Sequence, residues 1–365
     1  MFSSDSYHGF FPTVLIALLM SVALPSLGCK SHSPEPMKKK SMTSSMPSSR
    51  DSQTVLTNLA TLGGEPIETL SPDEARKQPG VGDAAKVVLQ KEGKTTDPEP
   101  VKKVDDRTIP GPAGALPVRV YTPAGDGPFP IIVYFHGGGW VIATIDTYDS
   151  SARALANAAK AVVISVEYRK APEAKFPAAA DDAYAATQWA FANAGEVNGD
   201  ASRIAVVGES AGGNLATVAC LMAKDKGGQM PIYQVLVYPV TELDFNTESH
   251  RTHAMAKPLN AAMMVWFRGH YANSIAEDAM NPYAAPMKAK SLAGLPPATI
   301  ITAETDPLRD DGRLYADKLK GAGVKVHYRN FDAQMHEFFG LGAVVPDAKA
   351  AVEFAAEGLR GAFAK

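Results

Sequence analysis

The sequence has 365 residues, of which 45% are hydrophobic and 21% charged, with a formal net charge of −3 and two cysteines. This composition is typical of a globular protein, and the length favours one large domain with an appended segment over two equal domains. The charge balance gives no indication of a nucleic-acid partner, and two cysteines are too few for a disulfide framework.

An uncharged, mostly apolar run covers residues 13–24 and is too short to span a bilayer. Ser26-Leu27-Gly28 follows, with small residues where a signal peptidase needs them, so residues 1–28 are predicted to be a secretory signal peptide. Cys29 comes next, which indicates a bacterial lipoprotein whose lipid is attached to Cys29. Two features depart from that pattern: the first twelve residues lack Lys and Arg, and Ser26 replaces the usual Leu. The expected location is the periplasm, with membrane anchoring through Cys29, and a cytoplasmic protein is the alternative.

The next segments differ in composition. Residues 29–54 contain many Ser, Met, Pro and Lys residues, which predicts a disordered tether. Residues 55–100 carry helical signals, including Ser71 followed three positions later by Glu74, which is the sequence pattern of a capping box. Pro72 suits the first helical position. We expect these residues to form N-terminal helices, followed by a linker.

Residues 101–365 are predicted to form an α/β domain. Short strand-like runs lie at 118–121, 131–135, 161–166, 204–207, 233–238, 298–302 and 324–328. Most of them are continuously apolar, and helical stretches separate many of them. This pattern predicts a mostly parallel sheet with helices on both faces.

The motif His136-Gly137-Gly138-Gly139-Trp140 directly follows the strand-like run at 131–135. Three glycines in a row leave consecutive backbone N–H groups uncovered by side chains. Such groups can hold a tetrahedral oxyanion at hydrogen-bond distance. A flexible turn is the alternative interpretation.

Residues 208–212, Gly-Glu-Ser-Ala-Gly, have the form G-x-S-x-G. They lie between the apolar run at 204–207 and a helical stretch at 214–223, and strand, tight turn and helix are the context of a nucleophilic serine. Glycines leave room for the sharp turn, and the N-terminus of the following helix favours negative charge near Ser210. A plain strand-to-helix turn of small residues is the alternative.

The two motifs and their order resemble the hormone-sensitive-lipase family, the bacterial family IV esterases, within the α/β-hydrolase fold. Further segments match that family: residues 168–173 (Y-R-K-A-P-E, where the family has Y-R-L-A-P-E), 176–178, 181–182 and 200–203. The resemblance runs from about residue 55 to the C-terminus. Glu209 departs from the family's commoner Asp or Thr. G-E-S-A-G also occurs in type-B carboxylesterases, which are much longer and use Glu as the triad acid.

The resemblance implies a mostly parallel eight-stranded sheet flanked by helices, with a helical cap built from residues 55–100 and an insertion at about 243–290. The insertion contains an apolar helix at 261–268, whose large side chains either line a substrate channel or only attach the cap: Met263, Met264, Trp266 and Phe267. Trp140 follows the glycines, and Phe338 and Phe339 follow the expected base, so these rings are expected to shorten an acyl pocket.

A serine nucleophile needs a base, usually histidine, and a carboxylate that holds the base. In α/β hydrolases these follow in the order Ser, acid, His. The strand-like run at 298–302 is followed by Asp306-Pro-Leu-Arg-Asp, which matches the family's D-P-L-x-D and selects Asp306 as the acid. Glu304 is the rival acid.

His336 is the predicted base, because it lies beyond the last strand-like run in a loop and matches the family's H-x-F position. His327 lies inside that run, where its side chain is fixed to one face of the sheet. Three other histidines, His250, His253 and His270, precede the acid and fall within the cap insertion.

The sequence thus predicts a serine esterase for short- to medium-chain carboxylic esters. Ser210, Asp306 and His336 form its triad, the amides of Gly138, Gly139 and Ala211 bind the oxyanion, and no metal or cofactor is required. The alternatives are a non-catalytic ligand receptor on the same fold, or a hydrolase of amides or carbamates. The sequence makes no prediction of the oligomeric state.

Overall fold

The computed structural model describes residues 49–365, so the expected signal peptide, Cys29 and most of the expected tether lie outside the described residues. Helix α1 (Arg50–Thr61) begins after Ser49, whose side chain accepts a hydrogen bond from the Ser52 amide at 3.2 Å. This N-cap places residues 50–54 in the helix, which corrects the expected end of the tether. Among the described residues, no helix has both the length and the apolar character needed to cross a membrane.

An eight-stranded sheet forms the centre of the molecule, with the strand order β1-β2-β4-β3-β5-β6-β7-β8. The strands are β1 (Lys103–Gly111), β2 (Gly114–Thr122), β3 (Phe129–Phe135), β4 (Val162–Val166), β5 (Gly199–Glu209), β6 (Tyr233–Val237), β7 (Ala298–Thr305) and β8 (Val326–Met335). β2 pairs antiparallel with β1 and β4, and all other pairs are parallel. The predicted mostly parallel sheet is confirmed. The sequence analysis missed β1, which is a polar edge strand.

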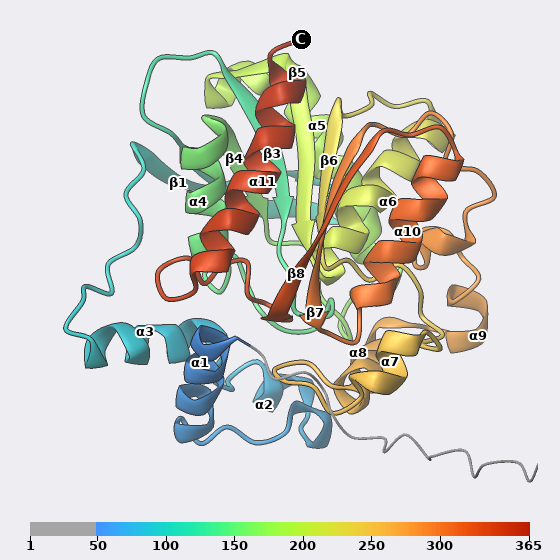
Figure 1. The fold of residues 1–365 in the computed structure, drawn as a ribbon. Coiled ribbons are helices and arrows are strands. Elements are labelled where there is room, and N and C mark those ends of the chain that lie inside the picture. Colours follow the sequence, from blue (N-terminus) through green and yellow to red (C-terminus); the bar gives the residue numbers. More distant parts are fainter. Residues whose placement is uncertain (1–48) are drawn as a thin grey trace, which may run out of the picture. The chain divides into compact units, whose positions relative to one another are not determined.

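Helices cover both faces of this sheet (Figure 1). α4 (Asp149–Ala159) and α11 (Pro346–Phe363) pack on one face, where Ile132 and Val163 belong to their cluster of buried side chains. α5 (Ala178–Ala192), α6 (Ala211–Lys226) and α10 (Arg309–Gly321) pack on the other, with Ile131 and Val133. Successive residues of β3 thus point into opposite cores, and burial on both faces explains why the central strands are continuously apolar.

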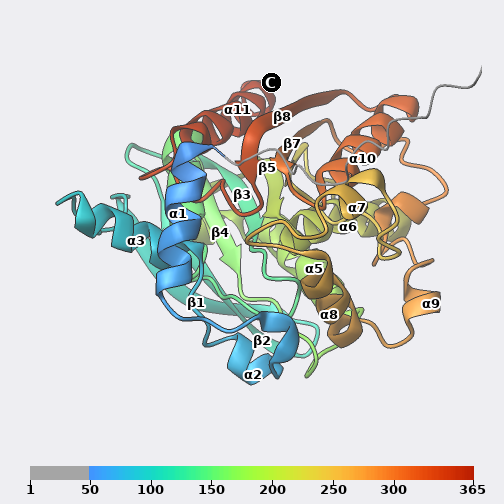
Figure 2. The same ribbon diagram turned by 60° about the horizontal axis from the view of Figure 1, so that its bottom comes forward.

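Two groups of helices lie at the edge of the sheet where β7 and β8 end (Figures 1 and 2). The first group contains α1, η1 (Ile67–Thr69), α2 (Pro72–Ala75) and α3 (Val81–Lys91), and the second contains α7 (Glu248–Thr252), α8 (Ala261–Tyr271), α9 (Ile275–Asp278) and η3 (Pro286–Lys288). The indole Nε1 of Trp266 donates to the Leu70 carbonyl at 3.1 Å, and Asn260 donates to Glu68 at 3.2 Å. These bonds join segments that are remote in sequence.

Candidate active site

Ser210 occupies the single position between the end of β5 and the start of α6. Its backbone has φ 57° and ψ −117°, a conformation that is strained for any residue except glycine. The turn is held because the Ser210 amide donates to Val237 O at 2.9 Å and the Ser210 carbonyl accepts from the Val240 amide at 3.2 Å. Strain of this kind is common at functional sites, and here it presents the hydroxyl at the carboxyl edge of the sheet.

The glycines on either side of Ser210 are required by backbone contacts. A Cβ at Gly208 would lie 2.0 Å from the Gly212 carbonyl oxygen, and a Cβ at Gly212 would lie 1.9 Å from that of Phe135. Backbone atoms cannot move aside as the end of a flexible side chain can. The G-x-S-x-G spacing therefore follows from the close approach of β5, α6 and β3.

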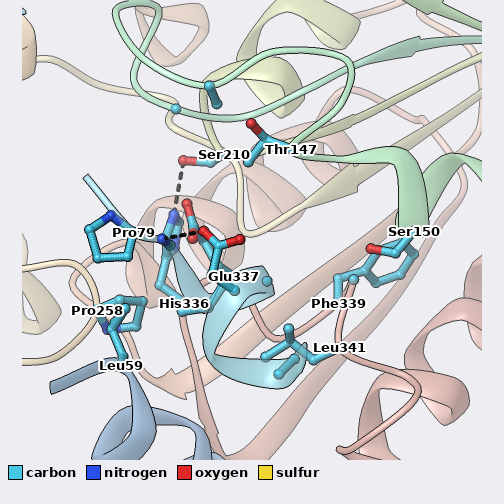
Figure 3. A pocket seen from close by; sticks show the side chains of 18 of the residues that line it. Leu59, Pro79, Thr147, Ser150, Ser210, Pro258, His336, Glu337, Phe339 and Leu341 are labelled. Carbon is cyan, nitrogen blue, oxygen red and sulfur yellow. Dashed lines mark hydrogen bonds between the residues drawn. The ribbon is translucent and has the colours of Figure 1, made fainter. Parts of the chain in front are cut away.

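The structure brings the three predicted triad residues together, and Figure 3 shows two of them, Ser210 and His336. His336 Nε2 lies 2.9 Å from Ser210 Oγ, and His336 Nδ1 lies 2.7 Å from Asp306 Oδ2. The other oxygen of Asp306 accepts from the Leu308 amide at 2.8 Å, which fixes the carboxylate just beyond β7. All three side chains are buried. In this geometry the serine hydroxyl donates to Nε2, and Nδ1–H donates to the carboxylate.

The other candidate acid, Glu304, and the other histidine near the base, His327, do not take part in these contacts. The carboxylate of Glu304 accepts from Arg309 Nη1 at 2.7 Å and from Asn330 Nδ2 at 2.8 Å, so both of its oxygens are engaged away from the imidazole. His327 lies near the start of β8, whereas His336 directly follows the end of that strand. The length of β8 therefore separates His327 from the serine.

Burial alone lowers the pKa of the His336 imidazole, but the charge and hydrogen bond of Asp306 outweigh it, so the pKa lies above its ordinary value of 6.5. The carboxylates of Glu337 and Glu209 act in the same direction. A neutral imidazole is needed to accept the proton of a serine hydroxyl.

We expect kcat/KM for ester hydrolysis to rise with pH, with a midpoint above pH 6.5, because the imidazole becomes neutral only above its raised pKa. Glu337→Gln should move this midpoint to lower pH, because it removes a negative charge that raises the pKa of His336. The measurement is kcat/KM across the pH range for both proteins. A midpoint that moves upward in Glu337→Gln would contradict this electrostatic account.

The loop after β3 forms the wall opposite the imidazole. Gly138 and Gly139 have φ values of 92° and 59°, which glycine tolerates at little cost. A Cβ at Gly138 would lie 2.4 Å from the Ile142 carbonyl oxygen, and one at Gly139 would lie 2.3 Å from the Phe267 ring. Within residues 49–365, the amides of Gly138, Gly139 and Ala211 donate no hydrogen bond to another protein atom. They remain available to an oxyanion.

His136 and Tyr168 pack beside this loop and hold its backbone in place. The Tyr168 hydroxyl donates to the His136 carbonyl at 2.8 Å, and the two rings stack with centroids 4.4 Å apart. Burial lowers the pKa of His136 to about 4, so the ring is neutral at physiological pH. We assign His136 a structural role, which is to hold the glycines in place.

A cavity of about 1690 Å³ opens above the serine. It is lined by Ser210, His336 and the glycine loop, together with residues of both groups of helices at the carboxyl edge. The predicted substrate-binding residues Trp140 and Met263 line it, as do Met264, Phe267 and Phe339. The Trp140 indole stacks on Tyr271 with ring centroids 4.1 Å apart, so its position is fixed by packing.

The structure corrects the other two substrate-binding predictions. Phe338 is fully buried and packs against Tyr238 and Phe331, with ring centroids 6.1 and 5.4 Å apart, so it belongs to the core beside the site. Trp266 does not line the cavity either, because its indole packs against Phe267 and bonds to the Leu70 carbonyl. Its role is to attach the second group of helices to the first.

The sequence analysis missed a buried carboxylate under the serine. Glu209 accepts hydrogen bonds from the hydroxyls of Tyr134, at 2.5 Å, and Tyr238, and burial raises the pKa of its carboxyl. The Tyr238 ring in turn lies 4.6 Å from the His336 ring. The two tyrosines come from the ends of β3 and β6, which lie on either side of β5. Their contact with Glu209 can therefore be predicted only once the strand order is known.

Comparisons with known proteins show the family to which the chain belongs. A protein-family model described as an alpha/beta hydrolase fold matches residues 132–340. The chain is 43% identical to the carboxylesterase NlhH of Mycobacterium tuberculosis over 72% of its own length and 84% of that protein. It is 34% identical to the ethyl acetate hydrolase of Pseudomonas putida, with 81% and 92% covered. The solved structure of a thermostable esterase from Pseudomonas putida matches with a TM-score of 0.79 and 36% identity, covering 88% of this chain and 99% of that one.

Proposed function

The chain is a carboxylic ester hydrolase of the hormone-sensitive-lipase family, within the α/β-hydrolase superfamily, and we propose that it acts on short- to medium-chain esters through Ser210, His336 and Asp306. The observation that carries the triad assignment is the unbroken chain of contacts from serine to carboxylate, at 2.9 and 2.7 Å. It is the arrangement that activates a weak nucleophile.

In the proposed first step, Ser210 Oγ attacks the ester carbonyl carbon while His336 Nε2 accepts the hydroxyl proton. The carbonyl oxygen becomes an oxyanion, which the amides of Gly138, Gly139 and Ala211 stabilise from the positive end of α6 and the glycine loop. His336 then gives its proton to the leaving alcohol as the carbon–oxygen bond breaks. Asp306 stabilises the charged imidazolium throughout.

In the second step, water attacks the acyl-enzyme and His336 accepts a proton from it. The tetrahedral intermediate collapses, the serine oxygen regains the proton, and the carboxylic acid leaves. Both half-reactions use the same base and the same three amides. Every proton is carried by an imidazole nitrogen that already contacts the serine.

The preference for short acyl chains rests on the apolar wall beside the glycine loop. The Phe267 ring packs so closely that a Cβ on Gly139 would lie 2.3 Å from it, and Met263 and Met264 line the same cavity. Each methylene that fits should add about 0.8 kcal/mol of binding, or about fourfold in kcat/KM. The increase in kcat/KM should stop at the chain length at which the acyl chain contacts these apolar side chains.

We therefore expect kcat/KM on p-nitrophenyl esters to rise from acetate, reach a maximum at or below roughly eight carbons, and then fall. Phe267→Ala should move the maximum to longer chains, because it removes a ring that lines the cavity. Val265→Ala is the control on the same helix, since Val265 is exposed and does not line the cavity. A wild-type maximum on palmitate would refute the short pocket. An equal shift in both variants would show that the effect is not local to Phe267.

For the N-terminal segment we propose export and processing to a mature chain that begins with lipidated Cys29. The support is the apolar run at 13–24 followed closely by Leu27, Gly28 and Cys29. Mass spectrometry of the native N-terminus after cell fractionation tests this. An intact Met1 in the cytoplasm would refute export, whereas a mature but unlipidated N-terminus would refute only the anchor.

A further inference from the structure

Glu337 directly follows the base, and its side chain lines the same cavity as Ser210 and His336 (Figure 3). Its backbone has φ 62°, in the left-handed region that glycine occupies easily and that a long side chain occupies at a cost. A charged residue at such a position, next to a catalytic base, indicates that the side chain itself has a role.

The carboxylate of Glu337 is only partly satisfied by the protein. Its Oε1 accepts one hydrogen bond from the hydroxyl of the buried Tyr148, at 3.1 Å. Within residues 49–365 it makes no ion pair with a cationic side chain. A half-buried carboxylate with no cation beside it gives this part of the cavity a negative electrostatic potential. A positively charged group on a ligand can pair with it.

The position of Glu337 indicates which part of an ester it would face. His336 must reach the leaving oxygen to protonate it, so the leaving alcohol lies on the imidazole side of Ser210. Glu337 directly follows His336, and its carboxylate accepts from the Tyr148 hydroxyl, which lies beside Gly137. The hydroxyl-bearing residues Thr147 and Ser150 line the cavity with it. The apolar Phe267 packs instead against the oxyanion glycine. The wall beside His336 thus carries a carboxylate and hydroxyl groups together with the apolar Phe339 and Leu341.

From this geometry we infer that Glu337 recognises a positively charged group on the alcohol portion of the substrate. The preferred substrate class is then esters of amino alcohols, and esters with an anionic alcohol portion are disfavoured. The inference rests on the proposed function, because it assigns the alcohol side from the direction of proton transfer. An ion pair at a partly buried site mainly lets the enzyme distinguish charged from uncharged substrates, and it adds less to the overall binding affinity.

The test compares thioacetates that differ only in charge at the alcohol end: acetylthiocholine and its neutral isostere S-(3,3-dimethylbutyl) thioacetate. Release of the thiol is followed with a disulfide reagent, and the ratio of the two kcat/KM values is the readout. We expect wild type to favour the cationic ester and Glu337→Gln to lower the ratio by about five- to tenfold. Glu337→Gly should lower it likewise, while relieving the left-handed strain.

Glu65→Gln is the matched control, because Glu65 also lines the cavity and the change removes the same charge from another part of its wall. Its ratio should equal that of wild type. If Glu337→Gln leaves the ratio of kcat/KM values unchanged, the inference is wrong and the esterase assignment stands. The same holds if Glu65→Gln lowers the ratio as much as Glu337→Gln does. Failure of wild type to hydrolyse both p-nitrophenyl acetate and the thioesters would overturn the proposed function and this inference with it. Hydrolysis of p-nitrophenyl acetate but of neither thioester would overturn this inference alone.

Discussion

Ser210→Ala is expected to lower ester hydrolysis by about 10⁴- to 10⁶-fold, because removal of a triad member disables the whole unit. The hydroxyl contacts His336 Nε2 at 2.9 Å, and alanine has no group to make this contact. The turn itself is held by backbone bonds to Val237 and Val240, which alanine retains. The variant should therefore fold, with a circular dichroism spectrum and Tm close to those of wild type.

The matched control for this change is Ser165→Ala, since Ser165 is a buried serine on β4 that does not line the cavity. It should retain most of the wild-type activity. Hydrolysis by purified, folded Ser210→Ala at a tenth of the wild-type rate would show that another residue is the nucleophile.

Asp306→Asn should cost about 10⁴-fold in kcat, because a carboxamide no longer accepts the Nδ1 proton and holds the imidazole in the wrong tautomer. The substitution keeps the size of the side chain, and its oxygen can still accept the Leu308 amide, which now bonds Oδ1 at 2.8 Å. We therefore expect little change in Tm. Kinetics with a p-nitrophenyl ester at saturating concentration measure the effect.

Glu304→Gln is the comparison that decides between the two acids. Glu304 is bonded to Arg309 and Asn330, so its neutralisation should affect stability more than turnover. If Glu304→Gln proved more damaging to kcat than Asp306→Asn, the assignment of the acid would be wrong.

Local signals were sufficient to predict the triad contacts. Ser210 lies in a turn that demands glycines on both sides, Asp306 directly follows β7, and His336 directly follows β8. Each of these signals lies within a few residues of the side chain that it identifies. The parallel sheet then brings the three together, because the carboxyl ends of neighbouring parallel strands share one edge.

Features that depend on tertiary packing could not be predicted in this way. β1 alternates exposed and half-buried residues at the edge of the sheet and lacks the apolar run that revealed the other strands. Phe338 and Phe339 are adjacent, yet only the second lines the cavity, because the loop turns one ring into the core. The partners of Glu209 come from β3 and β6, and only the strand order makes them neighbours.

The most direct test of the nucleophile is the site of covalent modification by a fluorophosphonate. The reagent loses fluoride when an activated serine oxygen attacks phosphorus, and the resulting adduct imitates the tetrahedral intermediate. Peptide mass mapping of the inactivated enzyme should find one adduct per chain, on Ser210, and Ser210→Ala should remain unlabelled. An adduct on a different residue, or complete inactivation without any adduct on Ser210, would contradict the proposed mechanism.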